Sequence, residues 1–272
     1  MRSLIALMVL LVHPVIAQDL YNKEHSKAFA EYLFKSGQYH LAAIELERIT
    51  FNEPDNDSLK VMLVRAYSLE QSFDQALRTI QRLYPKTEQL QHPFASLFAY
   101  NLIEADETDK AMAMLRVNST LSPEQKLWYE GFAYLKKNEF KKTLHLFSNT
   151  DLQNGSLLKL KTLAQEGAAL RLKKPWLAAS MSTLVPGTGK LYTGDWKDAL
   201  ISMVSIGLTG YQAYKGFERN GVKSTYGWIY ATVGTGFYLG NIYGSVASAK
   251  RRNKRNLNRI KAKVDDTFRL HP

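Results

Sequence analysis

The stretch Phe34–Pro54, with the sequence FKSGQYHLAAIELERITFNEP, recurs in altered form at Tyr67–Pro85 as YSLEQSFDQALRTIQRLYP. Gly37 occupies the place where two helices of a hairpin must turn closely. Gln71 takes that place in the second copy, 34 residues later. A repeat period of this length is typical of stacked helical hairpins. We therefore expect an all-α fold built from repeated hairpins.

The residues that follow each turn also match. Tyr39 aligns with Phe73, and Ala42 aligns with Ala76, again 34 residues apart. We expect the aromatic ring to fill the space between the two helices of a hairpin, and the alanine to let the second helix approach the first. Apolar residues at spacings of three and four on both sides of each turn predict amphipathic helices.

The series Gly37, Tyr39, Ala42 and Pro54 resembles the tetratricopeptide repeat, in which a small residue, an aromatic residue, an alanine and a closing proline follow in this order. Two weaker copies continue it with spacings of 35 and 32 residues, so that the resemblance covers about residues 22–170.

The resemblance implies a helical-hairpin solenoid whose concave groove holds a peptide or a partner helix. Tyr39, Arg65 and Tyr67 are the residues that we expect in this groove. The alternative is that the repeats pack only against one another or act as a spacer.

Residues 1–17 predict a cleavable signal peptide. Arg2 gives a positive start, Leu4–Val12 is an apolar run, and small or modest side chains end at Ala17. A retained N-terminal anchor is the alternative, because Arg2 is the only charge. We expect export, with the repeat domain in the bacterial periplasm.

The chain has no cysteine and a net charge of +11. Without disulfides an exported protein is held by packing alone, which favours a bacterial envelope. Residues 250–263 carry eight basic residues and no acidic one, so much of the excess lies in this basic tail. Because the tail follows a long apolar stretch, anionic lipid headgroups explain it better than nucleic acid does. We expect no nucleic-acid partner.

After Lys174 and Pro175 the sequence becomes apolar and rich in small residues. Pro186–Gly194, PGTGKLYTG, holds a proline and three glycines and predicts a compact turn. The apolar segments Ala199–Tyr214 and Gly227–Ala249 contain no charged residue. Since a soluble helix of such length rarely lacks charge, we expect a transmembrane helical hairpin.

Small residues recur every fourth position in the second apolar segment, at Gly236, Gly240, Gly244 and Ser248. This spacing predicts a face on which two helices touch backbone to backbone in lipid. Asn241 is costly in an apolar helix, and we expect it to make a hydrogen bond between helices rather than to serve transport.

Two glycine motifs together resemble a recurrent bacterial membrane module. The resemblance covers about residues 173–253 and implies a membrane hairpin, but no known activity. The motif residues are Pro186, Gly187, Gly189, Tyr192 and Gly194 in the turn, and Gly240, Asn241 and Gly244 in the closing Gly-Asn-Ile-Tyr-Gly.

Sequence motifs for catalysis are missing. Gly189-Lys190 is followed by Leu191 instead of Ser or Thr, and no strand precedes it, which argues against a phosphate-binding loop. No Gly-x-Ser-x-Gly nucleophile motif occurs. The spacing of His25, His40, His92 and His145 fits no metal motif. We expect no enzyme activity, no cofactor and no metal.

The topology contains a conflict. With a cleaved signal, two crossings return the basic tail to the periplasmic side, against the positive-inside rule. Three arrangements resolve it: Trp176–Val185 also enters the membrane, Ala199–Tyr214 does not cross, or the hairpin lies on the membrane surface.

These patterns predict an envelope adaptor that is tethered to membrane lipids and binds a protein or peptide partner through its repeats. The alternative is a structural subunit of an envelope assembly or secretion complex that forms homo-oligomers through the hairpin. A small transporter is disfavoured, because two short helices line no pathway. The expected parts are a signal peptide (1–17), a repeat domain (18–172), a membrane hairpin (173–249) and a basic tail (250–272).

Overall fold

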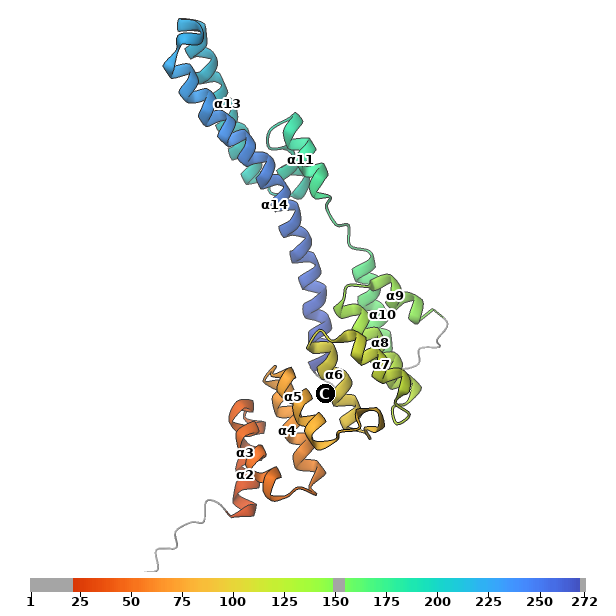
Figure 1. Cartoon of the computed structure of the whole chain (residues 1–272). Helices are drawn as coiled ribbons and strands as arrows, with labels where there is room; N and C mark the ends of the chain where they lie inside the picture. Colours follow the sequence, from red (N-terminus) through yellow and green to blue (C-terminus); the bar gives the residue numbers. More distant parts are fainter. Residues whose placement is uncertain (1–21, 149–154, 270–272) are drawn as a thin grey trace, which may run out of the picture. The chain divides into compact units, whose positions relative to one another are not determined.

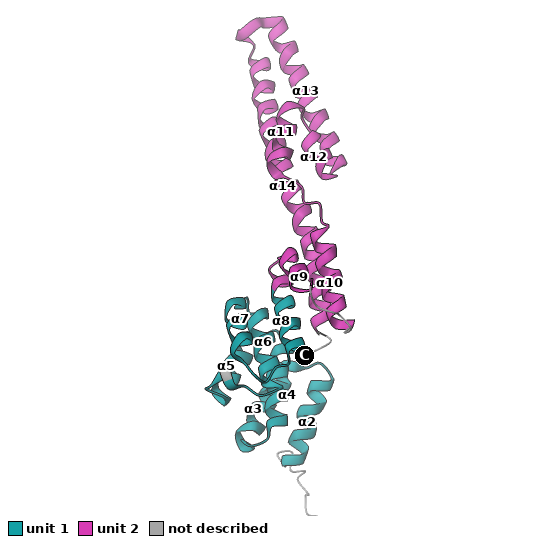
Figure 2. Ribbon diagram, turned by 90° about the vertical axis from the view of Figure 1, so that its right-hand side faces the viewer, with its two compact units in different colours: residues 1–133, 271–272 teal, residues 134–270 magenta. Residues whose placement is uncertain are grey.

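The computed structural model describes residues 22–148 and 155–269, and its regular elements are all helices (Figure 1). The all-α prediction is therefore confirmed. The predicted signal peptide lies outside the described residues. By packing, the chain divides into two compact units, unit 1 with residues 1–133 and 271–272, and unit 2 with residues 134–270 (Figure 2).

Unit 1 contains consecutive antiparallel helices that contact their neighbours along the chain. Its elements are α2 (Lys23–Lys35), α3 (Tyr39–Asn52), α4 (Asp57–Leu69), α5 (Phe73–Leu83), the short η1 (Thr87–Gln89), α6 (Phe94–Glu104), α7 (Thr108–Val117) and most of α8 (Pro123–Lys136).

Four tight turns recur along the chain, and each is made by one residue with a positive φ. These are Gly37 at 77°, Gln71 at 66°, Asp106 at 62° and Asn138 at 57°. In each turn the amide of the next residue donates a hydrogen bond to the carbonyl five residues earlier. The pairs are Gln38 to Leu33, Ser72 to Tyr67, Glu107 to Leu102 and Glu139 to Tyr134. One turn geometry thus repeats at the spacings read from the sequence.

The core of unit 1 consists of large apolar side chains, including Leu46, Leu63, Ile80 and Ile103. The first helices of two successive hairpins, α4 and α6, also touch each other. A buried hydrogen bond of 2.8 Å from the Asn101 amide to the Ser68 hydroxyl joins them. Contacts of this kind bury the apolar face of one hairpin against the next, so that the hairpins stabilise one another.

Unit 2 is organised along one long helix, α14 (Thr225–Arg269). The other elements are α9 (Phe140–Leu146), α10 (Gly155–Ala168), α11 (Pro175–Leu184), α12 (Thr188–Thr193), α13 (Trp196–Asn220) and η2 (Gly221–Lys223). Helices α11, α12 and α13 pack on the N-terminal half of α14, and α10 packs on its C-terminal half.

The basic tail was predicted as a separate part from residue 250, but α14 continues through that position without a break. Its C-terminal half joins α10 through an ion pair of 2.5 Å between Lys263 and Glu166, and Lys136 pairs with Asp265 at 2.9 Å. The compact units divide at residue 133, so α9 and α10 belong to unit 2.

Among the described helices, none combines the length and the apolarity that a membrane crossing requires. The prediction that Ala199–Tyr214 and Gly227–Ala249 span a membrane is therefore not supported.

Candidate functional site

The glycine-rich turn predicted at Pro186–Gly194 is the best-defined local arrangement in unit 2. Gly187 and Gly194 have φ values of 87° and 85° and form the two ends of α12. A Cβ on Gly187 would lie 2.7 Å from the carbonyl oxygen of Ala199, and a Cβ on Gly189 would overlap the carbonyl oxygen of Ala178. Glycine is therefore required at these positions by close backbone approach.

Asn241 closes this turn from α14. Its side-chain oxygen accepts a hydrogen bond of 3.2 Å from the Gly187 amide, and the residue is buried. The Ser182 hydroxyl accepts a hydrogen bond of 3.0 Å from the Gly189 amide and lies 2.7 Å from the Ser245 hydroxyl. The predicted interhelical hydrogen bond of Asn241 is thus present, and it joins the two glycine motifs.

Tyr192 and Pro186 lie at the edge of the same turn and are half-buried. The Tyr192 hydroxyl accepts a hydrogen bond of 3.2 Å from the Lys174 amide. The Lys173 ammonium lies 4.3 Å from the centre of the Tyr192 ring, within cation–π range. The lysines that precede α11 are thereby held against α12.

A second polar cluster follows where α12 meets α13. The Thr193 hydroxyl lies 2.5 Å from that of Ser248, which also donates to the Asp195 carboxylate. The Arg252 guanidinium donates a hydrogen bond of 2.6 Å to the Thr193 carbonyl. Gly194 leaves room for Arg252, because a Cβ there would overlap the guanidinium.

The predicted small-residue face of α14 is only partly packed. Gly244 lies against Lys190, whose ammonium donates a hydrogen bond of 2.7 Å to the Ser202 hydroxyl. A Cβ on Gly236 or Gly240 would meet nothing within 4 Å. These two glycines thus make no close helix contact within the described chain, where α13 approaches α14 at Gly234 instead, and their contact with a second copy stays a prediction.

Between Pro175 and Ala249, all of which the structure describes, no Leu, Ile, Val, Phe, Tyr or Trp side chain is buried. The buried positions are small or polar: Ala178, Ser182, Thr193, Ala199, Ser202, Thr209, Ala213, Ser224, Asn241, Ser245, Ser248 and Ala249, together with Gly187, Gly189, Gly216 and Gly227. From α11 to the N-terminal half of α14, small and polar residues are thus inside and large apolar residues outside, the opposite of a water-soluble core.

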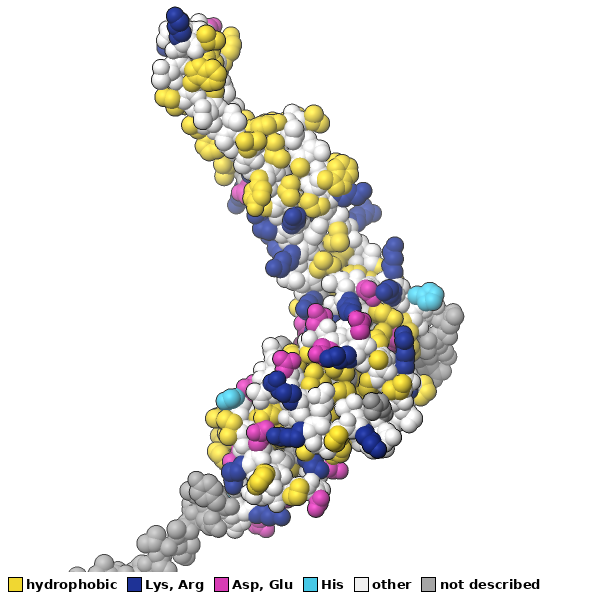
Figure 3. Space-filling model, in the orientation of Figure 1, with side chains coloured by type: hydrophobic (Ala, Val, Ile, Leu, Met, Phe, Trp, Pro, Cys, Tyr) yellow, Lys and Arg dark blue, Asp and Glu magenta, His cyan; other side chains and the backbone are white. Residues whose placement is uncertain are grey.

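The large apolar side chains of this segment point outward. Figure 3 shows them gathering over α11, α13 and the N-terminal half of α14, with Lys and Arg side chains where they end. We call this set the apolar surface. It consists of Trp176, Leu184, Val185, Leu191, Trp196, Leu200, Ile201, Val204, Leu208, Tyr211, Tyr214, Val222, Tyr226, Trp228, Ile229, Val233, Phe237, Leu239 and Tyr243.

Exposed large apolar side chains gathered in one part of a chain are typical of an interaction site. The exposed large apolar residues of this surface outnumber those in the rest of the described chain. The helices beneath it carry no charged residue from Ala199 to Tyr214 or from Ser224 to Ala249. The patch therefore fits an apolar environment, either lipid or another protein.

The predicted repeat-packing residues occupy their expected places in part. Ala42 and Ala76 are completely buried, as close helix approach requires. Tyr39 packs edge-on against Phe34, with ring centres 5.6 Å apart. Phe73 packs against a tyrosine of α6 in the same way. Pro54, in contrast, is exposed in the connection between α3 and α4.

The predicted groove residues do not line a groove together. Tyr67 is only 7% exposed, and burial, followed by its hydrogen bond with Glu47, raises the pKa of its phenol to about 12. The guanidinium of Arg65 lies over the Phe34 ring at 6.0 Å. The prediction that Tyr67 is a groove residue is wrong, because this side chain belongs to the packing between helices.

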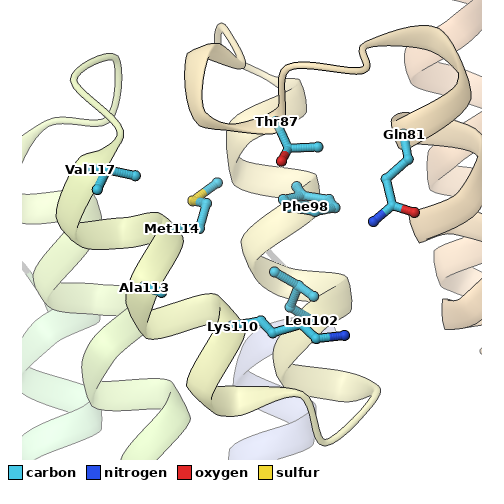
Figure 4. A pocket seen from close by; sticks show the side chains of 8 residues that line it. All are labelled: Gln81, Thr87, Phe98, Leu102, Lys110, Ala113, Met114 and Val117. Carbon is cyan, nitrogen blue, oxygen red and sulfur yellow. The ribbon is translucent and has the colours of Figure 1, made fainter.

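A groove of about 330 Å³ lies elsewhere in unit 1, over α6 and between α5 and α7 (Figure 4). Buried Phe98, Leu102 and Met114 form its apolar floor. Its remaining lining residues are Gln81, Thr87, Lys110, Ala113 and Val117, of which Val117 is 62% exposed. The groove is therefore mainly apolar, with polar groups at Gln81, Thr87 and Lys110, a composition that is usual in binding pockets.

The described residues contain no group of three or more His, Asp or Glu side chains that could hold a metal ion. Comparisons of the chain with protein-family models, with curated proteins and with solved structures found no match.

The sequence did not identify three of the polar residues that hold the turn, namely Ser182, Thr193 and Ser245, and it offered Ser248 only as a small residue on a helix face. Only their spacing gives a signal: Asn241, Ser245 and Ser248 follow one another at intervals of four and three and so share one face of α14. Their partners lie more than fifty residues away in the chain.

Proposed function

We propose that the chain is a membrane-tethered adaptor, in which the helical repeats bind a protein or peptide partner and helices α11 to α14 attach to lipid. The observation that carries this proposal is the reversed packing of these helices, with small and polar residues inside and the apolar surface outside. In lipid, large apolar side chains gain nothing from burial, and helices associate through small and hydrogen-bonding residues.

Interfacial aromatic residues support lipid attachment. Trp176 and Trp196 are exposed at one end of the apolar surface, and Tyr226 and Trp228 are exposed near the other end, beside the turn of η2. Trp and Tyr concentrate at the boundaries between a bilayer and water. The Lys215, Arg219 and Lys223 side chains lie near that second end, where a charged group reaches water.

Membrane attachment is tested by fractionating cells and washing the membrane fraction with high salt and then with alkaline carbonate. The proposal expects the chain to stay with the membrane in both washes, because apolar burial does not depend on ionic strength. Release of the chain by high salt alone would contradict attachment through the apolar surface.

The repeat domain is proposed to bind its partner in the groove over α6, which replaces the groove residues expected from sequence. A photo-crosslinking residue in place of Ala113 is expected to capture a protein in cells, since Ala113 lines the groove and is exposed. The matched control places the same residue at Arg78, an exposed position on α5 outside the groove. Equal adducts at both positions would contradict the groove as the binding site.

The proposed location is the periplasmic side of a bacterial envelope. Protease sites inserted before Lys23 and after Pro272 test it in intact and in osmotically opened cells. Cleavage before Lys23 only after opening of the outer membrane supports the periplasmic location. Protection of that site in opened cells would contradict it.

A second candidate is a structural subunit that forms homo-oligomers through the hairpin. It is favoured by the open faces of Gly236 and Gly240 on α14 and of Gly207 and Gly210 on α13, where a second helix could approach closely. Gly240→Leu separates the two candidates. A subunit loses its oligomer in mild detergent, whereas an adaptor keeps its partner and its membrane attachment.

A further inference from the structure

Cations from three segments of the chain meet at one end of the apolar surface. The side-chain amide of Asn253 binds the backbone of Lys173, accepting from its amide and donating to its carbonyl, both at 2.7 Å. Asp195, which immediately precedes α13, is 4.0 Å from Arg251 and from Arg255 of α14. The segments before α11, at the start of α13 and in the middle of α14 are thereby held together.

We call the resulting group the basic collar. Its members are Lys173, Lys174, Lys197, Lys250, Arg251, Lys254 and Arg255. Arg252 is not a member, because its guanidinium is engaged by the Thr193 carbonyl.

The basic collar has a large excess of positive charge. The carboxylates near it are Asp195, shared at 4.0 Å by two arginines, and the exposed Asp198. The side chains of Arg251 and Arg255 remain 61% and 69% exposed, and those of Lys250 and Lys254 are exposed as well. The collar can therefore take up further anions.

The position of the collar indicates which anion it meets. Trp176 and Trp196, 64% and 60% exposed, lie in the same segments as Lys174 and Lys197, and the apolar surface begins with them. Towards this end of the surface, apolar residues are followed by indoles and then by cations. This order matches that of acyl chains, interface and headgroups in a bilayer. A nucleic-acid site combines cations with aromatic rings that stack on bases, whereas this apolar surface also exposes aliphatic side chains such as Leu200 and Ile201.

We infer that the basic collar binds the phosphate groups of anionic lipid headgroups at a membrane surface. This inference rests on the proposed membrane attachment and names the lipid class that it selects. The collar contributes electrostatic binding beside the apolar contact, and it places one defined end of the α13–α14 hairpin at the headgroups.

The test is co-flotation of the purified full chain with vesicles of phosphatidylcholine and with vesicles of phosphatidylcholine and phosphatidylglycerol. We expect binding to both kinds and tighter binding to the anionic kind. The difference should shrink when salt rises from about 0.1 M to about 1 M, since the Debye length falls from about 10 Å to about 3 Å.

Lys250→Gln combined with Lys254→Gln removes two exposed cations of the collar. We expect it to weaken binding to the anionic vesicles by about 25-fold, about five-fold for each basic residue near the surface, and to leave binding to neutral vesicles unchanged. The matched control, Lys141→Gln with Lys159→Gln, removes the same charge from exposed lysines of α9 and α10. It should leave binding to both kinds of vesicle unchanged.

Equal, salt-independent binding to both kinds of vesicle would overturn the inference and leave membrane attachment standing. No binding to either kind would overturn attachment as well. Tighter binding to duplex DNA than to anionic vesicles, weakened by the same lysine variants, would replace the lipid by nucleic acid.

Discussion

The repeat hairpins of unit 1 and helices α11 to α14 of unit 2 are both built from antiparallel helices, but they distribute side chains in opposite ways. In unit 1 large residues such as Leu46, Leu63 and Ile80 are buried. In residues 175–249, which comprise α11 to α13 and the N-terminal half of α14, the buried positions hold Gly, Ala, Ser, Thr and Asn, and the large residues face outward. The first arrangement gains stability by removing apolar area from water. The second gains it from close backbone contact and hydrogen bonds, as helices in lipid do.

The turns of the two regions also differ in the residues that form them. Three of the four repeat turns use Gln, Asp or Asn at a positive φ, and in the fourth a Cβ on Gly37 would meet nothing within 4 Å. The turn around α12 uses glycine, because Ala178 and Ala199 approach it from two helices. Sequence variation should therefore be tolerated in the repeat turns and rejected in the glycine turn.

The largest effect is expected from Gly189→Ala. The added Cβ overlaps the Ala178 carbonyl, and overpacking against a backbone that cannot move costs about 3 kcal/mol. Gly240→Ala is the control, because its Cβ meets nothing and alanine favours the helix by about 1 kcal/mol. Thermal unfolding of the full chain in detergent measures both. Equal unfolding temperatures for the two variants would contradict the close contact.

Asn241→Leu should come next in size. It leaves the buried Gly187 amide without its acceptor, which costs about 1 to 3 kcal/mol. Trypsin cleavage after the half-buried Lys190 should become faster, by about ten-fold for each 1.4 kcal/mol lost. Tyr243→Leu, an exposed change two residues away, serves as the control. An unchanged cleavage rate in Asn241→Leu would show that this hydrogen bond does not hold the turn.

The core of unit 1 should respond to alkaline pH. Burial first, and then Glu47, raises the pKa of Tyr67 to about 12 from the ordinary value of 10. A raised folded-state pKa means that the associated stability is complete below pH 10 and is lost as the pH rises towards 12. Denaturant unfolding between these pH values should show a decline that is smaller in Tyr67→Phe. Burial raises the pKa of Tyr129 to about 12 as well, so a remaining decline is expected. An identical decline in Tyr67→Phe would contradict the assignment.

The smallest effect is expected at a repeat turn. Gln71→Gly relieves a positive φ and should raise the free energy of unfolding by about 0.5 to 1 kcal/mol. Gln75→Gly, on the exposed face of α5, should lower it by about 1 kcal/mol. Denaturant unfolding measures both variants. Changes of opposite sign in the free energy of unfolding support the turn geometry, and a decrease in both variants would refute it.

Much of this architecture was accessible from the sequence. The period between Gly37 and Gln71 predicted the hairpins, because a close turn and a buried alanine constrain residue type at fixed spacing. The glycines of Pro186–Gly194 predicted the compact turn for the same reason.

The rest depends on three-dimensional proximity that the sequence does not encode locally. Tyr67 was expected in a groove but is buried, since both places suit an aromatic residue on a helix. The collar joins cations from segments about eighty positions apart, which the hydrogen bonds between Asn253 and the Lys173 backbone hold together. The continuation of α14 through the basic run was missed because the end of an apolar stretch need not be the end of a helix.

The central claim is that the apolar surface of α11 to α14 is covered by lipid, and thiol accessibility tests it most directly. The chain has no cysteine, so single cysteines in place of Leu208 and Val233 report on the surface, and one in place of Phe51, which lies outside the proposed groove, reports on unit 1. All three side chains are exposed in the chain by itself. In isolated membranes opened to reagent on both sides, we predict that a water-soluble maleimide labels the cysteine at 51 and spares those at 208 and 233. Equal labelling of all three would mean that the apolar surface meets water and would contradict the account.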